Sequence, residues 1–278
     1  MLKIGCHLSF SNGYTYAAKQ IVSIGGNTYQ YFSRNPQGGA AKPFDINDFN
    51  KFIAFAKENN IGCLLCHAPY TLNPCSAKVE TREFADMVLK DDIEKLEHFD
   101  NALYNIHPGS YTTLSVDEGI ELIIKALNKV IKPEQKTTIL LETMAGKGSE
   151  IGRSFEEIKR IIDGIIYKDK IGVCLDTCHV YSAGYDIVNE LDAVLNKFDE
   201  IIGIDKLKAI HLNDSKMPFA SNKDRHEKIG EGTLGLQAFI NIINHPKLKD
   251  LPFYLETPNE IDGYQKEIEL LKSYYKQD

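Results

Sequence analysis

The chain has 278 residues, which is long for one average domain but usual for the larger α/β architectures, so its length does not require two domains. Its composition of 43% hydrophobic and 26% charged residues is typical of a globular protein, and no apolar run approaches the ~18–20 residues that cross a bilayer, so we expect no membrane segment. The formal net charge of −7 taken alone argues against a nucleic-acid-binding domain, because such domains are usually basic.

The chain opens directly on a strand-like segment, so we expect no secretory signal and a cytoplasmic location. Its six cysteines are then not expected to form disulfides. Cys63 and Cys66 form a C-x-x-C, but no second pair completes a four-cysteine zinc site, and residues three apart on a strand point to opposite faces. We interpret both as buried structural cysteines.

Apolar runs of strand length alternate with longer segments of helical periodicity along the whole chain. The expected strands are 3–8, 28–32, 62–67, 103–107, 137–142, 172–176, 207–212 and 253–256. The expected helices are 14–24, 46–59, 78–99, 116–131, 154–166, 187–202, 234–244 and 260–275. Ser115 and Ser154 each precede a glutamate by three residues, which is typical of a helix start.

Eight strands that alternate with eight helices are the count of a (β/α)₈ TIM barrel, an α/β fold. A doubly wound open sheet is the competing α/β architecture, but no G-x-G-x-x-G follows the first strand, so a dinucleotide-binding fold has no support. Because we find neither a linker nor a low-complexity segment, we predict a single TIM-barrel domain over residues 1–278.

Candidate metal ligands stand at the ends of six predicted strands, or one residue beyond them. They are His67, His107, Glu142, Asp176, His211 and Glu256. The carboxyl ends of barrel strands share one mouth, where the chemistry of this fold is found. Each residue alone is more often a capping or core-satisfied group than a ligand, but several carboxylates buried together are costly unless cations pair with them.

Three more candidate ligands lie in the segments that follow, His179 after Asp176, and Asp224 with His226 near His211. Imidazole and carboxylate together suit zinc, manganese or iron. Nine ligands are too many for one ion, and with one bridging carboxylate they suit three. Three divalent ions would change the formal charge from −7 to −7 + 6 = −1 and concentrate the added charge at this site.

Several long motifs resemble the endonuclease IV (deoxyribonuclease IV) family of AP endonucleases, in order and from the first strand to the last. They are IGCHLS at 4–9, HPGS at 107–110, LLETMAGKG at 140–148, GVCLDTCH at 172–179, IHLNDSK at 210–216 and DRHEKIGEG at 224–232. The resemblance implies metal-dependent hydrolysis of the phosphodiester on the 5′ side of an abasic site in double-stranded DNA, the incision step of base excision repair. The expected products are a 3′-hydroxyl and a 5′-deoxyribose phosphate.

The resemblance also implies three zinc ions per chain, with manganese or iron in part of the sites. One ion is matched by His67, His107 and Glu142. A second is matched by Glu142, Asp176, His211 and Glu256, so that Glu142 bridges. The third is matched by His179, Asp224 and His226. Glu142 or Glu256 is expected to orient the nucleophile and is the predicted catalytic residue.

The DNA-contacting residues that the resemblance implies are less completely matched. Tyr70 matches the tyrosine that fills the gap left by a flipped abasic nucleotide. Gln37 stands where family members carry an inserted arginine, and Thr71 where a leucine is frequent. Gln37 keeps hydrogen-bonding capacity without the charge, and we expect Arg34 to compensate.

Two alternative functions follow from the same residues. A sugar isomerase or epimerase of the same barrel type uses a set with one or two metals that resembles Glu142, Asp176, His211 and Glu256. Such an enzyme does not need the remaining five candidate ligands together. A non-enzymatic metal-binding or lesion-binding protein is the second alternative, and the complete ligand set argues against it. Nothing in the sequence indicates an oligomer, so we expect a monomer.

Overall fold

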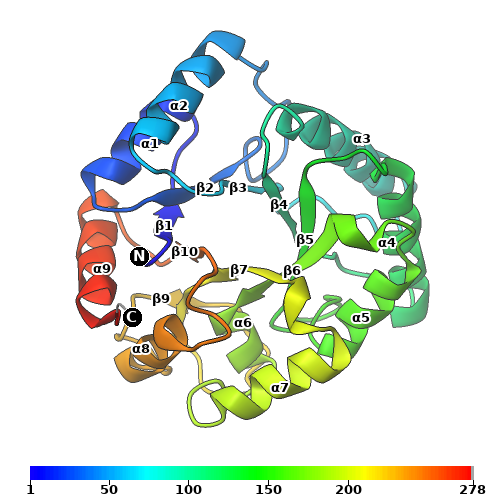
Figure 1. The fold of residues 1–278 in the computed structure, drawn as a ribbon. Coiled ribbons are helices and arrows are strands. Elements are labelled where there is room, and N and C mark those ends of the chain that lie inside the picture. The colour runs from blue at the N-terminus through cyan, green and yellow to red at the C-terminus, as the bar shows by residue number, and fades with distance from the viewer. Residues whose placement is uncertain (277–278) are drawn as a thin grey trace.

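Eight parallel strands close into a barrel in the computed structural model, which describes residues 1–276 (Figure 1). Around the barrel the strands follow the order β1-β10-β7-β6-β5-β4-β3-β2. Their bounds are β1 Ile4–His7, β2 Thr28–Phe32, β3 Leu65–His67, β4 Leu103–Ile106, β5 Thr138–Glu142, β6 Ile171–Asp176, β7 Leu207–His211 and β10 Phe253–Leu255. The predicted TIM barrel is confirmed, although most strands are a residue or more shorter than expected.

Helices surround the barrel, and the labelled N-terminal end of the chain lies beside α9 (Figure 1). The eight expected helices are α1 Tyr14–Ser23, α2 Ile46–Glu58, α3 Val79–Leu96, α4 Val116–Val130, α5 Phe155–Gly164, α7 Leu191–Ile201, α8 Leu236–Asn244 and α9 Ile261–Tyr274. Ser115 forms the expected capping box with Glu118, and Ser154 Oγ accepts a hydrogen bond from the backbone N–H of Glu157. Every helix in residues 1–276 is too short or too polar to cross a membrane.

Three short elements near the mouth were not expected from the sequence. Helix α6 Thr177–Ser182 begins directly after β6, so His179 lies on a helical turn and not in a loop. A two-stranded antiparallel sheet joins β8 Asp214–Ser215 to β9 His226–Glu227, so His226 lies on a short strand.

The helix expected at 187–202 starts later, at Leu191, because Asp186 accepts hydrogen bonds from the backbone of 188–190 and forms a turn. Two 3₁₀ turns, Lys168–Lys170 and Ile204–Lys206, precede β6 and β7.

The alternation of side chains along each strand divides the barrel into an outer and an inner layer. Outward-facing residues such as Cys66, Leu141 and Ile210 pack with the helices in the main hydrophobic core. Inward-facing residues form a second, smaller cluster: Leu65, Leu103, Leu140, Cys174, Ala209 and Tyr254. Two residues after each of these, on the same face of its strand, comes a polar residue: His67, Asn105, Glu142, Asp176, His211 and Glu256. The apolar cluster is therefore a floor beneath a layer of polar side chains.

Gly5 shows how closely the first two strands approach each other inside the barrel. A Cβ atom at this position would lie 1.7 Å from the backbone oxygen of Thr28. Glycine is therefore required here, because a side chain at this position would push β1 and β2 apart.

Candidate metal centre

Glu142 lies at the centre of the polar layer, with a histidine pair on each side of its carboxylate. Its Oε2 atom is 3.2 Å from His67 Nε2 and 3.3 Å from His107 Nε2. Its Oε1 atom is 3.2 Å from His179 Nδ1 and 3.3 Å from His211 Nδ1. The side chain of Glu142 is only 1% exposed. One buried carboxylate is thus shared by four imidazoles that come from four different segments.

A second group gathers around His211, whose side chain is fully buried. His211 Nδ1 lies 3.2 Å from Glu256 Oε2 and 3.8 Å from Asp176 Oδ2. With Glu142, these side chains offer three carboxylates and one imidazole whose candidate ligand atoms all lie within 4.8 Å of one another. The first group, His67, His107 and Glu142, meets the same limit.

A third group is built around Asp224, in the segment that leads into β9. Asp224 Oδ1 lies 3.3 Å from His179 Nε2 and 3.3 Å from His226 Nε2. His226 Nε2 is also 3.7 Å from Asp176 Oδ2, which connects this group to the second one. The nine side chains singled out from the sequence therefore lie together at the carboxyl ends of the barrel strands.

These spacings fit a metal ion better than direct ion pairs. Two ligand atoms bound at about 2.0–2.1 Å to one tetrahedral zinc ion are roughly 3.3 Å apart. The contacts of 3.2–3.3 Å between imidazole nitrogens and carboxylate oxygens have this length. Moreover, three buried nitrogens have no hydrogen-bond partner among the described residues: His179 Nε2, His211 Nδ1 and His226 Nε2. Buried polar atoms are rarely left without a partner. A metal cation bound by the lone pairs of these three nitrogens would supply the partner that each one lacks.

In three histidines of the cluster, the ring nitrogen Nδ1 faces a backbone carbonyl. His67 Nδ1 lies 2.6 Å from the oxygen of Ala68, His179 Nδ1 2.9 Å from that of Thr143, and His226 Nδ1 3.3 Å from that of Glu256. A carbonyl oxygen only accepts, so in a neutral ring Nδ1 carries the hydrogen and Nε2 presents its lone pair to the cluster. Such carbonyl contacts are the usual way in which proteins orient metal-binding histidines.

The pKa shifts within the cluster run in opposite directions. Burial alone would raise the pKa of Glu142, but the imidazoles of His211 and His107 outweigh burial and hold this pKa well below its usual range. Burial alone would lower the pKa of His179, but Asp176 and Asp224 raise it well above its ordinary value. The carboxylates therefore require positive charge beside them, which protons or metal cations can supply.

Comparison with known proteins identifies the family. The family model described as a xylose isomerase-like TIM barrel matches residues 18–274. A probable endonuclease 4 of Clostridium beijerinckii is 60% identical over 275 residues, which cover 99% of each chain. The crystal structure of endonuclease IV from Thermus thermophilus superposes with a TM-score of 0.85 at 27% identity and covers 98% of each chain. This chain belongs to the endonuclease IV family. The predicted family and enzyme class, a deoxyribonuclease IV of DNA repair, are confirmed.

The alternative of a sugar enzyme rests on the fold alone. D-psicose 3-epimerase from Clostridium cellulolyticum superposes with a TM-score of 0.69 over 98% of each chain, but it is only 14% identical. Fold likeness at this level does not carry function. The endonuclease IV relatives match along the full chain at much higher identity, so they decide between the two hypotheses.

Members of the polar layer that the sequence reasoning missed hold the proposed endonuclease IV ligands in place. Asn105 Nδ2 donates to Glu142 Oε2 at 2.5 Å. Asn213 Nδ2 donates to Asp176 Oδ2 at 2.7 Å, and Asn213 Oδ1 accepts from the backbone N–H of Glu256. Gln30 contacts both His211 and Glu256. Asn105 and Gln30 have a signal in the sequence, because each stands two residues after an inward-facing residue on its strand.

Asp214 organises the glycine-containing loop 229–234 at the edge of this mouth. Its fully buried carboxylate accepts four backbone N–H groups, those of Ser215, Gly230, Gly232 and Leu234, at 2.8–3.1 Å. A Cβ atom on Gly232 would lie 2.4 Å from Asp214 Oδ1, so a larger residue would displace this carboxylate. The loop 229–234 is thus shaped around an anion that belongs to the protein.

Of the three residues predicted to contact DNA, the structure leaves Tyr70 and Gln37 exposed and buries Arg34. Tyr70 is 55% exposed at the rim, and its ring lies 5.8 Å from the ring of His107. Gln37 is exposed on the neighbouring loop, which is tied to Tyr70 by a hydrogen bond from the backbone N–H of Tyr70 to the oxygen of Pro36. Arg34 is buried, and its guanidinium donates to Asp91 and Asp92 of α3. The expectation that Arg34 compensates for the missing charge on DNA is corrected, because two carboxylates already hold its guanidinium inside the protein.

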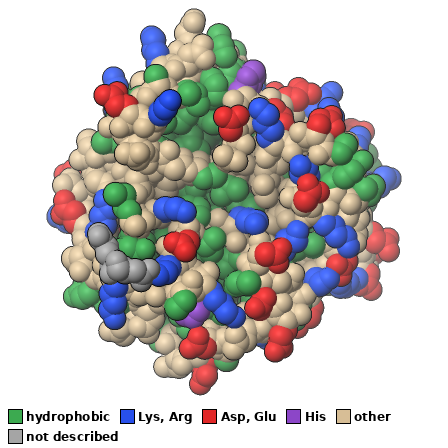
Figure 2. All heavy atoms as spheres, viewed as in Figure 1, with side chains coloured by type: hydrophobic (Ala, Val, Ile, Leu, Met, Phe, Trp, Pro, Cys, Tyr) green, Lys and Arg blue, Asp and Glu red, His purple; other side chains and the backbone are tan. Residues whose placement is uncertain are grey.

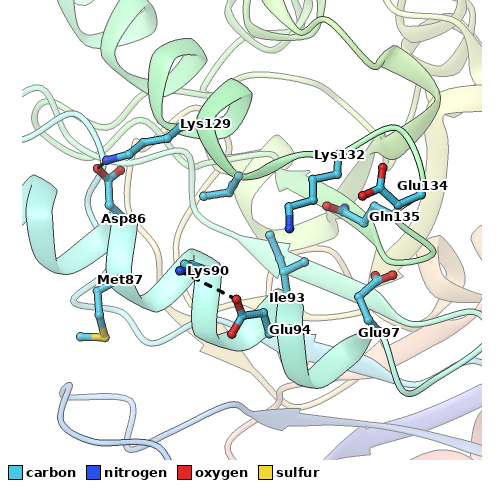
Figure 3. Close-up of a pocket in the computed structure, with 11 residues that line it drawn as sticks. Asp86, Met87, Lys90, Ile93, Glu94, Glu97, Lys129, Lys132, Glu134 and Gln135 are labelled. Atoms are coloured by element: carbon cyan, nitrogen blue, oxygen red, sulfur yellow. Dashed lines mark hydrogen bonds and ion pairs between the residues drawn. The ribbon is translucent and has the colours of Figure 1, made fainter.

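A hollow of about 720 Å³ lies between α3 and α4, outside the barrel (Figure 3). Lysines and carboxylates alternate along it; Lys129 pairs with Asp86, and Lys90 lies 4.0 Å from Glu94. None of the nine cluster residues lines this hollow. The face shown in Figure 2 likewise intermixes Lys and Arg with Asp and Glu. Neither feature offers an area of one charge that would select a partner.

Proposed function

We propose that this protein incises duplex DNA on the 5′ side of abasic sites and holds three zinc ions for this purpose. The observation that carries the proposal is the carboxylate of Glu142, which has one oxygen beside His67 and His107 and the other beside His211. A carboxylate placed in this way is suited to bridge two ions. Membership in the endonuclease IV family supports the same reading.

The ligands divide into three sets in this proposal. His67, His107 and Glu142 would hold one ion. Glu142, Asp176, His211 and Glu256 would hold the second, and His179, Asp224 and His226 would hold the third. When bound, zinc ions supply Lewis acidity, which lowers the pKa of water and neutralises charge on phosphate oxygens. The imidazole–carboxylate mixture is also compatible with manganese or iron in part of the sites.

Glu256 is the residue that we assign to the attacking water. Its side chain is 13% exposed, whereas that of Glu142 is 1% exposed and is enclosed by histidines. Burial would raise the pKa of Glu256, but His211 outweighs burial and lowers the pKa to about 2, so the carboxylate is ionised at neutral pH. An ionised carboxylate at the open side of the cluster accepts a hydrogen bond from a water molecule and so orients the lone pair of that water oxygen for attack.

Selectivity for abasic sites follows from the depth of the cluster. A phosphate in undistorted duplex does not reach the floor of a barrel mouth, so the damaged nucleotide must leave the stack. This costs least where base pairing is already lost. Tyr70, exposed at the rim, is placed to fill the resulting gap. We further propose that the protein acts as a monomer in the cytoplasm and that residues 1–278 form one domain.

The test combines metal analysis with a cleavage assay. Purified protein should contain about three transition-metal ions per chain. It should nick a duplex oligonucleotide with one tetrahydrofuran residue on its 5′ side and leave a 3′-hydroxyl that a polymerase extends. The same duplex with an intact base pair is the matched control and should stay uncut. One ion per chain together with turnover of a ketose sugar would overturn the proposal.

A further inference from the structure

Gln30 joins two of the proposed metal ligands through its side-chain amide. It lies on β2, is 0% exposed and occupies the same inner layer as His211 and Glu256. Gln30 Oε1 is 2.6 Å from His211 Nε2, and Gln30 Nε2 is 2.5 Å from Glu256 Oε1. The same amide nitrogen is 3.0 Å from His7 Nδ1. One buried amide therefore uses its acceptor and both of its donor hydrogens within the cluster.

The surroundings fix which way the amide points. A carboxylate only accepts hydrogen bonds, so the group of Gln30 that faces Glu256 must be the NH₂. The oxygen then faces His211 Nε2 and can only accept, so this nitrogen carries a hydrogen. In a neutral or metal-bound ring, His211 Nδ1 is left with the lone pair. A reversed amide would set two oxygens against each other at hydrogen-bond distance.

The lone pair selected in this way points into the candidate metal centre. His211 Nδ1 lies 3.3 Å from Glu142 Oε1 and 3.2 Å from Glu256 Oε2. It is also one of the buried nitrogens without a hydrogen-bond partner among the described residues. If Nδ1 carried the hydrogen instead, the ring would direct N–H at these carboxylates and would offer a metal ion no lone pair.

We propose that Gln30 is a positioning residue that selects the Nδ1-ligating form of His211 and holds Glu256 against the same ion. It contacts neither metal nor substrate in this assignment and acts through the two ligands. The inference rests on the proposed metal function. It goes further by giving β2, which supplies none of the nine ligands, a defined part in the site.

Two substitutions separate the two hydrogen bonds. Gln30→Met keeps the length of the side chain and removes both of these bonds, together with the contact to His7. Gln30→Glu keeps an oxygen that accepts from His211 Nε2–H but removes the donor to Glu256. The matched control is Gln135→Met, which removes another buried amide, one that donates to the backbone oxygen of Thr137 outside the metal centre.

The first measurement is zinc affinity by competition with a chromophoric chelator. Loss of a group that orients a metal ligand typically weakens binding about 10–100-fold. Gln30→Met should weaken one of three zinc ions by this factor, while Gln135→Met binds all three like the wild type. Wild-type affinity in Gln30→Met would overturn the role of Gln30 alone. A wild-type protein that binds no zinc would overturn the proposed function, and this inference with it.

The second measurement is the histidine ring ¹⁵N–¹H spectrum of the zinc-loaded protein. If Gln30 had a purely structural role, its substitution would leave this spectrum unchanged. The Nε2–H signal of His211 should persist in the wild type and in Gln30→Glu, because an oxygen accepts from it in both. It should be lost to rapid exchange with water in Gln30→Met. Persistence of the signal in all three proteins, or its loss in Gln30→Glu, contradicts tautomer selection by Gln30. Gln30→Glu keeps the test available if Gln30→Met does not fold.

Discussion

Oε1 of Glu142 and Nδ1 of His211 lie 3.3 Å apart in the interior of the barrel, with side chains that are 1% and 0% exposed. The two residues come from β5 and β7, which are separated in the sheet by β6. They meet because each is the inward-facing residue at the carboxyl end of its strand. The other oxygen of Glu142 faces His67 and His107, so this carboxylate connects the two halves of the cluster.

Substitution of Glu142 by Gln should abolish cleavage while much of the fold is retained. An amide cannot bridge two cations as a carboxylate does, and its NH₂ group would face imidazoles meant to bind metal. We expect a loss of at least about 10³-fold in kcat, measured on the tetrahydrofuran duplex. Glu97→Gln is the control, because Glu97 accepts backbone hydrogen bonds from Lys136 and Thr137 where β5 begins, at the opposite end of the barrel. Near-normal cleavage by Glu142→Gln would remove Glu142 from its assigned role.

Removal of metal should lower the thermal stability of the protein. Glu142, Asp176 and Glu256 belong to one group of side chains that could hold a metal, and ligands that bind only the native state stabilise it by mass action. Zinc at a hundred times its dissociation constant contributes about 2.7 kcal/mol. Calorimetry after chelation should show a lower Tm that zinc restores and magnesium, which prefers all-oxygen ligands, does not. Equal Tm values with and without chelator would argue against resident metal.

Affinity for abasic DNA should fall steeply with salt, because bound cationic side chains release counterions from the phosphates. Lys147 lies in the loop that follows β5 at the mouth, whereas Lys136 precedes β5 at the other end. Lys147→Gln should therefore reduce the slope of log affinity against log salt by about 1 in fluorescence anisotropy titrations, and Lys136→Gln should not. Identical slopes for the two variants would exclude Lys147 from the DNA contact.

Arg34→Met should destabilise the fold, because Asp92 would keep a buried charge without its cation. The guanidinium and Asp92 are 1% and 0% exposed, and Tyr104 also donates to Asp92. Loss of one partner of a buried pair costs about 3–5 kcal/mol, measurable by urea denaturation. Arg160→Met, which breaks an exposed pair with Asp117, should cost about 0–1 kcal/mol. Equal costs for the two substitutions would show that the buried pair has no special weight.

Tyr70→Ala should weaken binding of abasic DNA and leave the metal content unchanged. Stacking of a base on an aromatic ring is worth about 1–3 kcal/mol, so we expect roughly 5–150-fold weaker binding. Tyr274 is the matched control, since it is 43% exposed and is the last residue of α9, a helix that starts at the barrel mouth and runs to the opposite end. If both alanine variants bind abasic DNA like the wild type, Tyr70 does not fill the gap in the stack.

The sequence was sufficient where a property depends on neighbours in the chain. Apolar runs of strand length and segments of helical periodicity predicted the eight strands and helices of the barrel. The rule that strand ends share one mouth predicted that His67, Glu142 and His211 lie together. Short elements escaped prediction, because β8 and β9 have two residues each and exist only through pairing with one another.

The tertiary structure alone decided which buried groups pair. Gln30 and His211 are 181 residues apart, and only closure of the barrel sets their side chains 2.6 Å from each other. Arg34 was expected to contact DNA, but in the folded chain Asp91 and Asp92 of α3 bind its guanidinium. Hydrogen bonds act over a few ångströms, so the partner of a side chain depends on the register and closure of the sheet, which no local pattern encodes.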